Sequence, residues 1–224
     1  MDWTAIALSV RLATVVALIL LVVGLPLAYW LTFSRWRGKF LVEAVVALPL
    51  VLPPTVLGLY VLLAIGSRSP LGRLWTAWTG HPLAFTFEAL VLASLLYSLP
   101  FAVQPIAAAF SQVDVTLIEA SSTLGASRWR TFVRVILPLS IEGLVTGGVL
   151  SFAHTLGEFG VVLMVGGNLP GVTRTVSIAI YDHVQGFQYE AANQTALLLL
   201  GFSFAVLAGV YALLRKPWAI GPLS

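Results

Sequence analysis

Residues 117–138 read LIEASSTLGASRWRTFVRVILP. This run carries three arginines and one glutamate within 22 residues, and a long apolar segment lies on either side of it. If those two segments cross a membrane, the polar run must lie in water at one membrane surface, because charged side chains are costly to place in hydrocarbon. The fold therefore depends on whether the flanking segments are membrane spans.

The composition answers that question. Of 224 residues, 59% are hydrophobic and only 9% are charged, and the mean hydropathy is +0.97. A soluble domain typically carries about 25% charged residues, so this chain has too little polar surface to stay dissolved in water. We interpret it as an integral membrane protein. It contains no cysteine, which excludes disulfide and thiolate chemistry.

Long runs without any charged residue predict the membrane spans. Four such runs reach the roughly 20 residues that a helix needs to cross a bilayer, and a fifth is interrupted by Glu142, His154 and Glu158. We predict an all-α polytopic membrane protein that forms one domain over residues 1–224, with a polar loop over 114–138. The first helix is expected to be retained, because no small-residue cleavage site follows its apolar run. The five predicted transmembrane helices are 6–33, 42–66, 86–111, 139–165 and 191–214.

The distribution of positive charge predicts the orientation. Connections on the cytoplasmic side of a membrane carry more Lys and Arg than those on the opposite side. One set of connections holds eight of the twelve basic residues, and it includes the polar loop. We therefore expect the N-terminus outside and the loop and C-terminus in the cytoplasm, and the net charge of +3 needs no nucleic acid to explain it. The eight residues are Arg35, Arg37, Lys39, Arg128, Arg130, Arg134, Arg215 and Lys216.

Prolines interrupt two of the predicted helices. Pro49, Pro53 and Pro54 fall in the second helix, and Pro100 and Pro105 fall in the third. Each proline removes a backbone donor and clashes with the preceding turn, so we expect both helices to bend around a pathway, with Pro53 and Pro54 at a gate. The alternative is the ordinary excess of proline in transmembrane helices.

The polar loop itself reads as two short helices separated by Gly125. Glycine adopts the left-handed conformation that ends many helices, and Pro138 marks the start of the fourth span. Arg128, Arg130 and Arg134 would then lie at the membrane surface. On residues alone, the loop could be a connector held by lipid headgroups.

The same loop resembles the EAA loop of permease subunits of binding-protein-dependent ABC importers. The resemblance rests on Glu119-Ala120-Ser121, on Gly125, and on Val135-Ile136-Leu137-Pro138, with Ser121 in place of a second alanine and Val135 in place of isoleucine. In that family the loop docks on a cytoplasmic ATPase. The resemblance thus implies the following coupling residues: Glu119, Ala120, Ser121, Gly125, Arg128, Arg130, Leu137 and Pro138. We expect Glu119 to anchor the loop, by capping a helix or by pairing with Arg128 or Arg130.

Three further segments, 48–58, 155–160 and 168–182, resemble the molybdate permeases within this family. The resemblance implies the type I (MetI-like) permease fold and import of molybdate across the cell inner membrane, with tungstate or sulfate as alternatives. It also implies a homodimer, two cytoplasmic ATP-binding subunits and an extracytoplasmic oxyanion-binding protein. The chain lacks the G-x-x-x-x-G-K-[ST] phosphate loop, so we expect it to be no enzyme and to bind no cofactor. ATP and Mg would bind at the partner ATPase.

Glu158 and His154 are ionisable residues deep in a predicted span. They lie four residues apart, so on one helix they could pair. We interpret Glu158 as a hydrogen-bond lock of the helix, with direct substrate contact as the alternative. A metal site is not expected, because a closed zinc site needs about four ligands.

Two questions stay open on the sequence. Arg174, in the predicted outer loop, could dock the binding protein or could be an ordinary solvated charge. A different class, an ion-coupled secondary transporter or channel, would need carboxylates near the middle of the membrane, and Glu158 alone qualifies.

Overall fold

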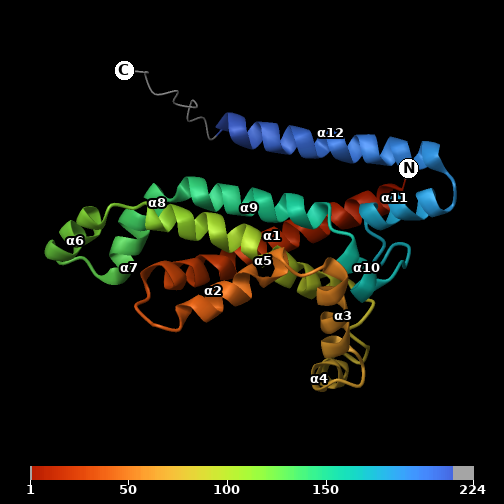
Figure 1. Ribbon diagram of the computed structural model, residues 1–224, viewed down its shortest axis with the longest axis horizontal. Helices are drawn as coiled ribbons and strands as arrows, with labels where there is room; N and C mark the ends of the chain where they lie inside the picture. The colour runs from red at the N-terminus through yellow and green to blue at the C-terminus, as the bar shows by residue number, and fades with distance from the viewer. Residues whose placement is uncertain (1, 214–224) are drawn as a thin grey trace.

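The computed structural model describes residues 2–213 as a chain of helices, and no strand occurs in that range. Figure 1 shows the arrangement. The elements are α1 (Trp3–Phe33), α2 (Lys39–Ala47), the 3₁₀ turn η1 (Leu48–Leu50), α3 (Pro54–Ile65), α4 (Pro70–Thr79), α5 (Phe87–Ser111), α6 (Val115–Thr123), α7 (Arg128–Thr131), the π-helical turn η2 (Phe132–Ile136), α8 (Leu137–Leu139), α9 (Ile141–Leu156), α10 (Gly160–Gly166), α11 (Val176–Gln185) and α12 (Tyr189–Leu213).

Within the described residues, three helices are long and apolar enough to cross a membrane: α1, α5 and α12. Two more spans are bent pairs. The α2–η1 segment and α3 meet at 111°, and the α7–α8 segment and α9 meet at 70°. Counting each pair as one span gives the five that the sequence predicts. The second span bends at its prolines, as expected, whereas the bend near Ser140 in the fourth span was not predicted.

Two adjacent prolines cause the break in the second span. Pro53 has an extended backbone (φ −55°, ψ 136°) and Pro54 is the first residue of α3. A residue that precedes proline is forced out of the helical conformation, so the first helix has to stop before Pro53. By contrast, α5 continues as one helix through Pro100 and Pro105. The expected effect of proline is therefore seen in the second span, and the third remains a continuous helix.

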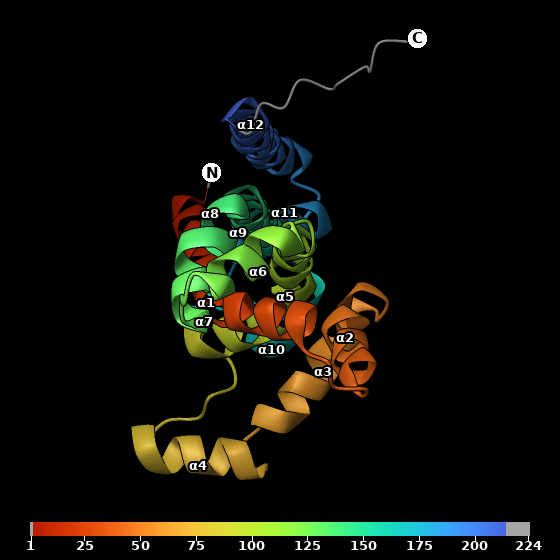
Figure 2. The same ribbon diagram turned by 90° about the vertical axis from the view of Figure 1, so that its left-hand side faces the viewer.

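Helices α1, α5 and α9 form the packed centre of the molecule (Figures 1 and 2). The contact between α5 and α9 depends on small residues: a Cβ on Gly147 would lie 2.8 Å from the carbonyl oxygen of Ala102, and one on Gly143 would overlap the Cβ of Ala109. Spacing of two glycines by four residues is a common device for close helix packing in membranes.

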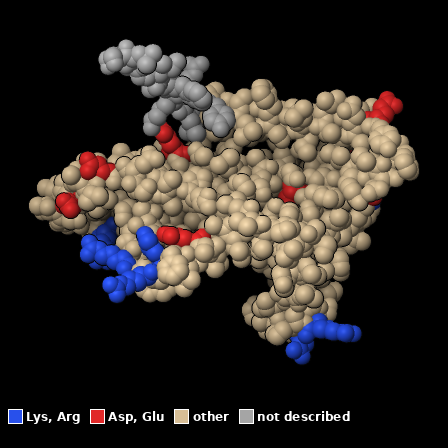
Figure 3. All heavy atoms as spheres, in the orientation of Figure 1, with Lys and Arg blue, Asp and Glu red and all other residues tan. Residues whose placement is uncertain are grey.

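The remaining elements lie at the two ends and along one side. α6, α7 and η2 gather at one end, α10 and α11 lie at the other, and α12 runs along the outside of the bundle (Figures 1 and 2). α4 stands away from the bundle beyond α3. Basic side chains cluster at the α7 end, with a smaller group at α4 (Figure 3).

Two helices were not predicted from the sequence. α11 lies in the stretch that we expected to be a turn-rich loop, and α4 follows the second span. The sequence does carry signals for α4, because Ser69 caps its first turn through Gly72, Pro70 is its first residue and Gly80 ends it at φ +78°. Arg215 and Lys216, which contribute to the predicted orientation, lie outside the described residues.

Candidate functional site

The loop 114–138 folds as two short helices, as predicted. The carboxylate of Asp114 accepts a hydrogen bond of 2.9 Å from the backbone N–H of Thr116 and so caps α6. That hydrogen bond lowers the pKa of the Asp114 carboxyl below its ordinary value. The hydroxyl of Ser127 accepts from the N–H of Arg130 at 3.3 Å and caps α7 in the same way. Each of the two helices thus begins at an N-cap residue within the loop itself.

Gly125 reverses the chain between the two helices, and the predicted left-handed conformation is confirmed. Its φ is +77°, in the region that side chains disfavour. The N–H of Gly125 donates to the carbonyl of Ser122, and the N–H of Ala126 donates to that of Ser121. These two hydrogen bonds satisfy carbonyl groups in the last turn of α6 and so end the helix. A Cβ at Gly125 would meet nothing within 4 Å, so only the backbone conformation demands glycine.

A hydroxyl pair joins the two helices across this turn. Ser121 Oγ and Thr131 Oγ1 lie 2.9 Å apart, and the Thr131 side chain is buried. The expected anchor was Glu119, by capping or by pairing with Arg128 or Arg130. That expectation is wrong: within the described residues Glu119 forms no ion pair and caps no helix, and its side chain is exposed.

Two buried side chains hold the loop against the bundle. Phe132 and Ile136 are 8% and 2% exposed and belong to one apolar cluster with residues of α1 and α5. The Phe132 ring lies edge-on to Tyr29 at 5.1 Å and to Phe110 at 6.1 Å. A movement of the loop must therefore displace the ends of both long helices.

The loop continues into the fourth span through an irregular turn. Pro138 cannot donate to the carbonyl four residues earlier, and the chain widens into the π-helical turn η2, in which the N–H of Leu137 bonds the carbonyl of Phe132. The axis then bends by 70° near Ser140 before α9 begins. Leu137 and Pro138 thus lie between the π-helical turn and the bend that joins the loop to the span.

The outward surface of the loop is apolar as well as basic. Leu117, Leu124 and Trp129 are 47%, 87% and 73% exposed. Arg128 and Arg130 are exposed too, and neither has an ion-pair partner in residues 2–213. Large apolar side chains exposed together, rimmed by charge, are typical of a protein interface.

A second polar group lies inside the bundle. Ser98 Oγ on α5 lies 2.9 Å from His154 Nδ1 and 2.8 Å from Thr155 Oγ1, both on α9. The His154 ring stacks on Phe101 with centroids 3.9 Å apart. Ser98 was not singled out in the sequence, because a serine 56 residues away from its partner gives no local signal.

Glu158 does not pair with His154, and this corrects the sequence interpretation. α9 ends at Leu156, so the two side chains no longer follow helical spacing. Glu158 is 4% exposed, and within the described residues neither of its carboxylate oxygens has a hydrogen-bond partner. The buried hydroxyl of Ser94 is the polar group that interacts with this carboxyl, although neither group meets strict hydrogen-bond geometry. The hydrogen-bond lock therefore stays a prediction. His154 and Glu158 provide only two possible ligands, and no cluster of three or more His, Cys, Asp or Glu occurs in residues 2–213.

Arg174 is held within its own loop. Its Nε donates to Asn168 Oδ1 at 2.6 Å, and its guanidinium pairs with Asp182 on α11 at 3.2 Å. The charge is therefore paired within the described residues, and its role in docking the binding protein stays a prediction. Arg174 ties the turn that follows α10 to the C-terminal half of α11.

Comparisons with families, relatives and solved structures give consistent results. The family described as binding-protein-dependent transport system inner membrane component matches residues 21–216. The chain is 49% identical to a molybdenum transport system permease protein, ModB, of Azotobacter vinelandii, over 94% of this chain and 93% of that protein. Its identity to ModB of Escherichia coli K12 is 40%, over 82% and 80%. In fold it resembles a subunit of the methionine ABC transporter MetNI, with a TM-score of 0.73 and 18% identity over 94% of this chain and 93% of that one.

Proposed function

Since the chain belongs to the family of binding-protein-dependent transport system inner membrane components, we propose that it is the permease subunit of an ATP-driven importer whose substrate is molybdate. The proposal for the substrate rests on the relatives that cover nearly the whole chain and are named for molybdenum transport. Tungstate and sulfate are the competing oxyanions.

The structure of loop 114–138 supports the proposed mechanism. Two cytoplasmic ATP-binding subunits dock on this loop in two copies of the chain, and each binds ATP and Mg, while the permease binds no cofactor. The exposed Leu117 and Leu124 are the contacts offered. Movement of an ATPase is passed on through Phe132 and Ile136 to the ends of α1 and α5, and through η2 to α9.

Two copies pair around a shared pathway, because five spans in one chain are few to enclose a route. The bent second span supports this arrangement. Val51, Tyr60 and Leu63 on or beside it are 82%, 66% and 62% exposed, and a second copy would cover them. The break at Pro53 and Pro54 places non-helical backbone at the level of the membrane, which is tolerated where it lines a cavity.

An extracytoplasmic binding protein delivers the oxyanion to the side that carries α4, α10 and α11. This requires the N-terminus outside and loop 114–138 inside the cell. The absence of cysteine makes the test direct: Ser67→Cys, before α4, should react with an impermeant thiol reagent in intact cells. Thr123→Cys, at the end of α6, should react only after the membrane is opened. The opposite pattern would invert the proposed orientation.

The function is tested by uptake into proteoliposomes that contain the permease, its ATPase and its binding protein. We expect uptake of labelled molybdate that requires ATP inside the vesicle. Unlabelled molybdate should compete more strongly than tungstate or sulfate. Uptake that follows an ion gradient without ATP would favour the secondary-transporter alternative and would overturn the proposal.

A further inference from the structure

Two adjoining cavities lie between the end of α1 and the loop 114–138. The larger, of about 800 Å³, is lined by hydroxyls, aromatic rings and two arginines. The smaller, of about 360 Å³, is almost entirely apolar. Tyr29 and Arg128 line both, so the two cavities adjoin at these side chains and give a site with a polar and an apolar part.

The polar part is suited to an anion. Arg35 and Arg128 both line it, together with the hydroxyls of Ser34 and Thr131, and no acidic residue does. Neither arginine has an ion-pair partner within residues 2–213. The hydroxyl of Ser34 accepts from the N–H of Trp36 at 3.2 Å, which leaves its own proton free to donate.

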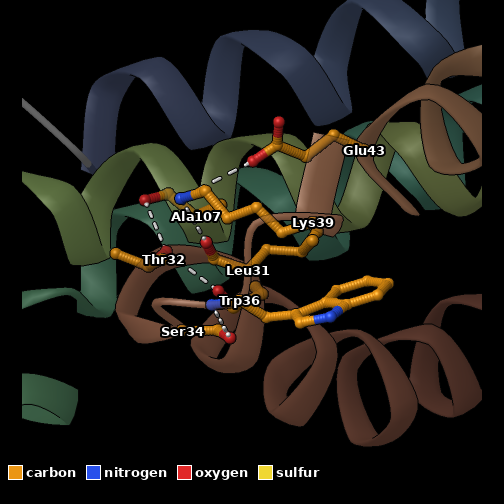
Figure 4. Close-up of polar contacts among 8 residues, drawn as sticks. Leu31, Thr32, Ser34, Trp36, Lys39, Glu43 and Ala107 are labelled. Carbon is orange, nitrogen blue, oxygen red and sulfur yellow. Dashed lines mark hydrogen bonds and ion pairs between the residues drawn. The ribbon is translucent and has the colours of Figure 1, made fainter. Parts of the chain in front are cut away.

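The neighbouring Lys39 shows the contrast (Figure 4). Its Nζ donates to the carbonyl of Leu31 at the end of α1 and lies 3.9 Å from the carboxylate of Glu43. The Lys39 ammonium thus bonds a carbonyl at the end of α1, whereas the guanidinium groups of Arg35 and Arg128 form no ion pair within the described residues. A planar guanidinium binds a phosphate group through paired hydrogen bonds.

The apolar part extends into the membrane. Its walls include Leu25, Pro26, Trp129 and Phe132. Leu25 precedes Phe33, the last residue of α1, by eight residues, so at 1.5 Å per residue it lies about 12 Å further towards the middle of the bilayer. Trp129, the tryptophan in the wall, is of a residue type that is enriched at the membrane–water boundary.

We propose that this site binds one anionic phospholipid from the bilayer. The phosphate lies between Arg35 and Arg128, and an acyl chain lies in the groove beside Leu25, Pro26 and Trp129. The lipid thereby fills the space between α1 and α7 and ties the loop to the membrane surface. Two arginines without acidic neighbours favour a headgroup of net negative charge over a zwitterionic one.

Native mass spectrometry of the purified permease tests the proposal, with phosphatidylglycerol and phosphatidylethanolamine as the two added lipids. We expect phosphatidylglycerol to be retained preferentially. The double variant Arg35→Gln/Arg128→Gln should weaken its retention by about tenfold for each guanidinium removed, the loss expected when a charge-assisted hydrogen bond is deleted. Arg68→Gln/Arg73→Gln, which removes two arginines at the α4 end, is the matched control and should retain the lipid as the parent does.

A second variant separates the headgroup from the acyl chain. Leu25→Trp fills the groove and leaves both arginines in place, so it should also lose the lipid, and glycerol 3-phosphate should not displace the lipid from the parent. Equal retention of the two lipids, or full retention by the arginine variant, would overturn the proposal. So would loss of the lipid on addition of the ATPase subunit alone, because the cavity would then belong to the docking interface. None of these readouts depends on transport, and they stand or fall apart from the proposed substrate.

Discussion

Substitution of Gly125 gives the sharpest test of loop 114–138 as an ATPase-docking element. At φ +77° the residue lies in the left-handed region, and the space around it is open to beyond 4 Å. Gly125→Val therefore adds backbone strain without a steric clash. Nothing nearby holds the valine in place, so the free loop can relieve the strain by changing its conformation, and docking must then restore the original one.

The size of the effect follows from the cost of that conformation. A side chain in the left-handed region costs roughly 1–2 kcal/mol, and a β-branched one lies at the upper end of the range. If docking has to restore about 2 kcal/mol, the affinity for the ATPase falls by up to about 30-fold, since 1.4 kcal/mol is tenfold. Asparagine tolerates this conformation, so Gly125→Asn should lose much less affinity than Gly125→Val.

Gly80 provides a matched control at the opposite end of the molecule. It ends α4 at φ +78° and likewise has nothing within 4 Å, so Gly80→Val introduces the same strain away from the loop. The assay is the dissociation constant of the ATPase for the permease in detergent, followed by ATPase activity in liposomes. If the Gly125 and Gly80 variants bind the ATPase equally well, the conformation of this loop is not what the ATPase recognises.

Three further predictions concern the interior and the outer loop. Glu158→Gln should melt close to the parent, because the amide can keep the interaction with Ser94, whereas Glu158→Leu should lose about 1–3 kcal/mol of stability; a leucine variant as stable as the parent would show that the carboxyl holds nothing. Gly147→Ala should destabilise the permease by about 1–3 kcal/mol, because its Cβ meets backbone of α5 at 2.8 Å. The adjacent Gly148→Ala meets only a flexible leucine end at 3.2 Å and should melt close to the parent. Arg174→Ala and Asp182→Asn should reduce binding-protein-dependent uptake to the same extent if their ion pair positions the outer loop, whereas a loss confined to the arginine variant would indicate direct docking.

Much of the architecture follows from local sequence. A chain with 9% charged residues has to place its apolar segments in lipid, where backbone groups are satisfied only within helices or closed barrels. The approximate spans could therefore be predicted from composition and length. The left-handed turn at Gly125 and the break at Pro53 and Pro54 could be predicted as well, because both are local properties of the backbone.

The tertiary structure decided which side chains meet. Glu119 was expected to anchor the loop, but the contact is made by Ser121 and Thr131. His154 was expected beside Glu158, but it bonds Ser98 on another helix. The hydroxyl of Ser9 accepts from the N–H of Val176, 167 residues away. Such pairs depend on helix breaks and crossing angles that sum over the whole chain, and a change of one residue in a helix turns a side chain by about 100°. The sequence by itself thus determined the membrane spans and the loop, and only their packing determined the contacts within the site.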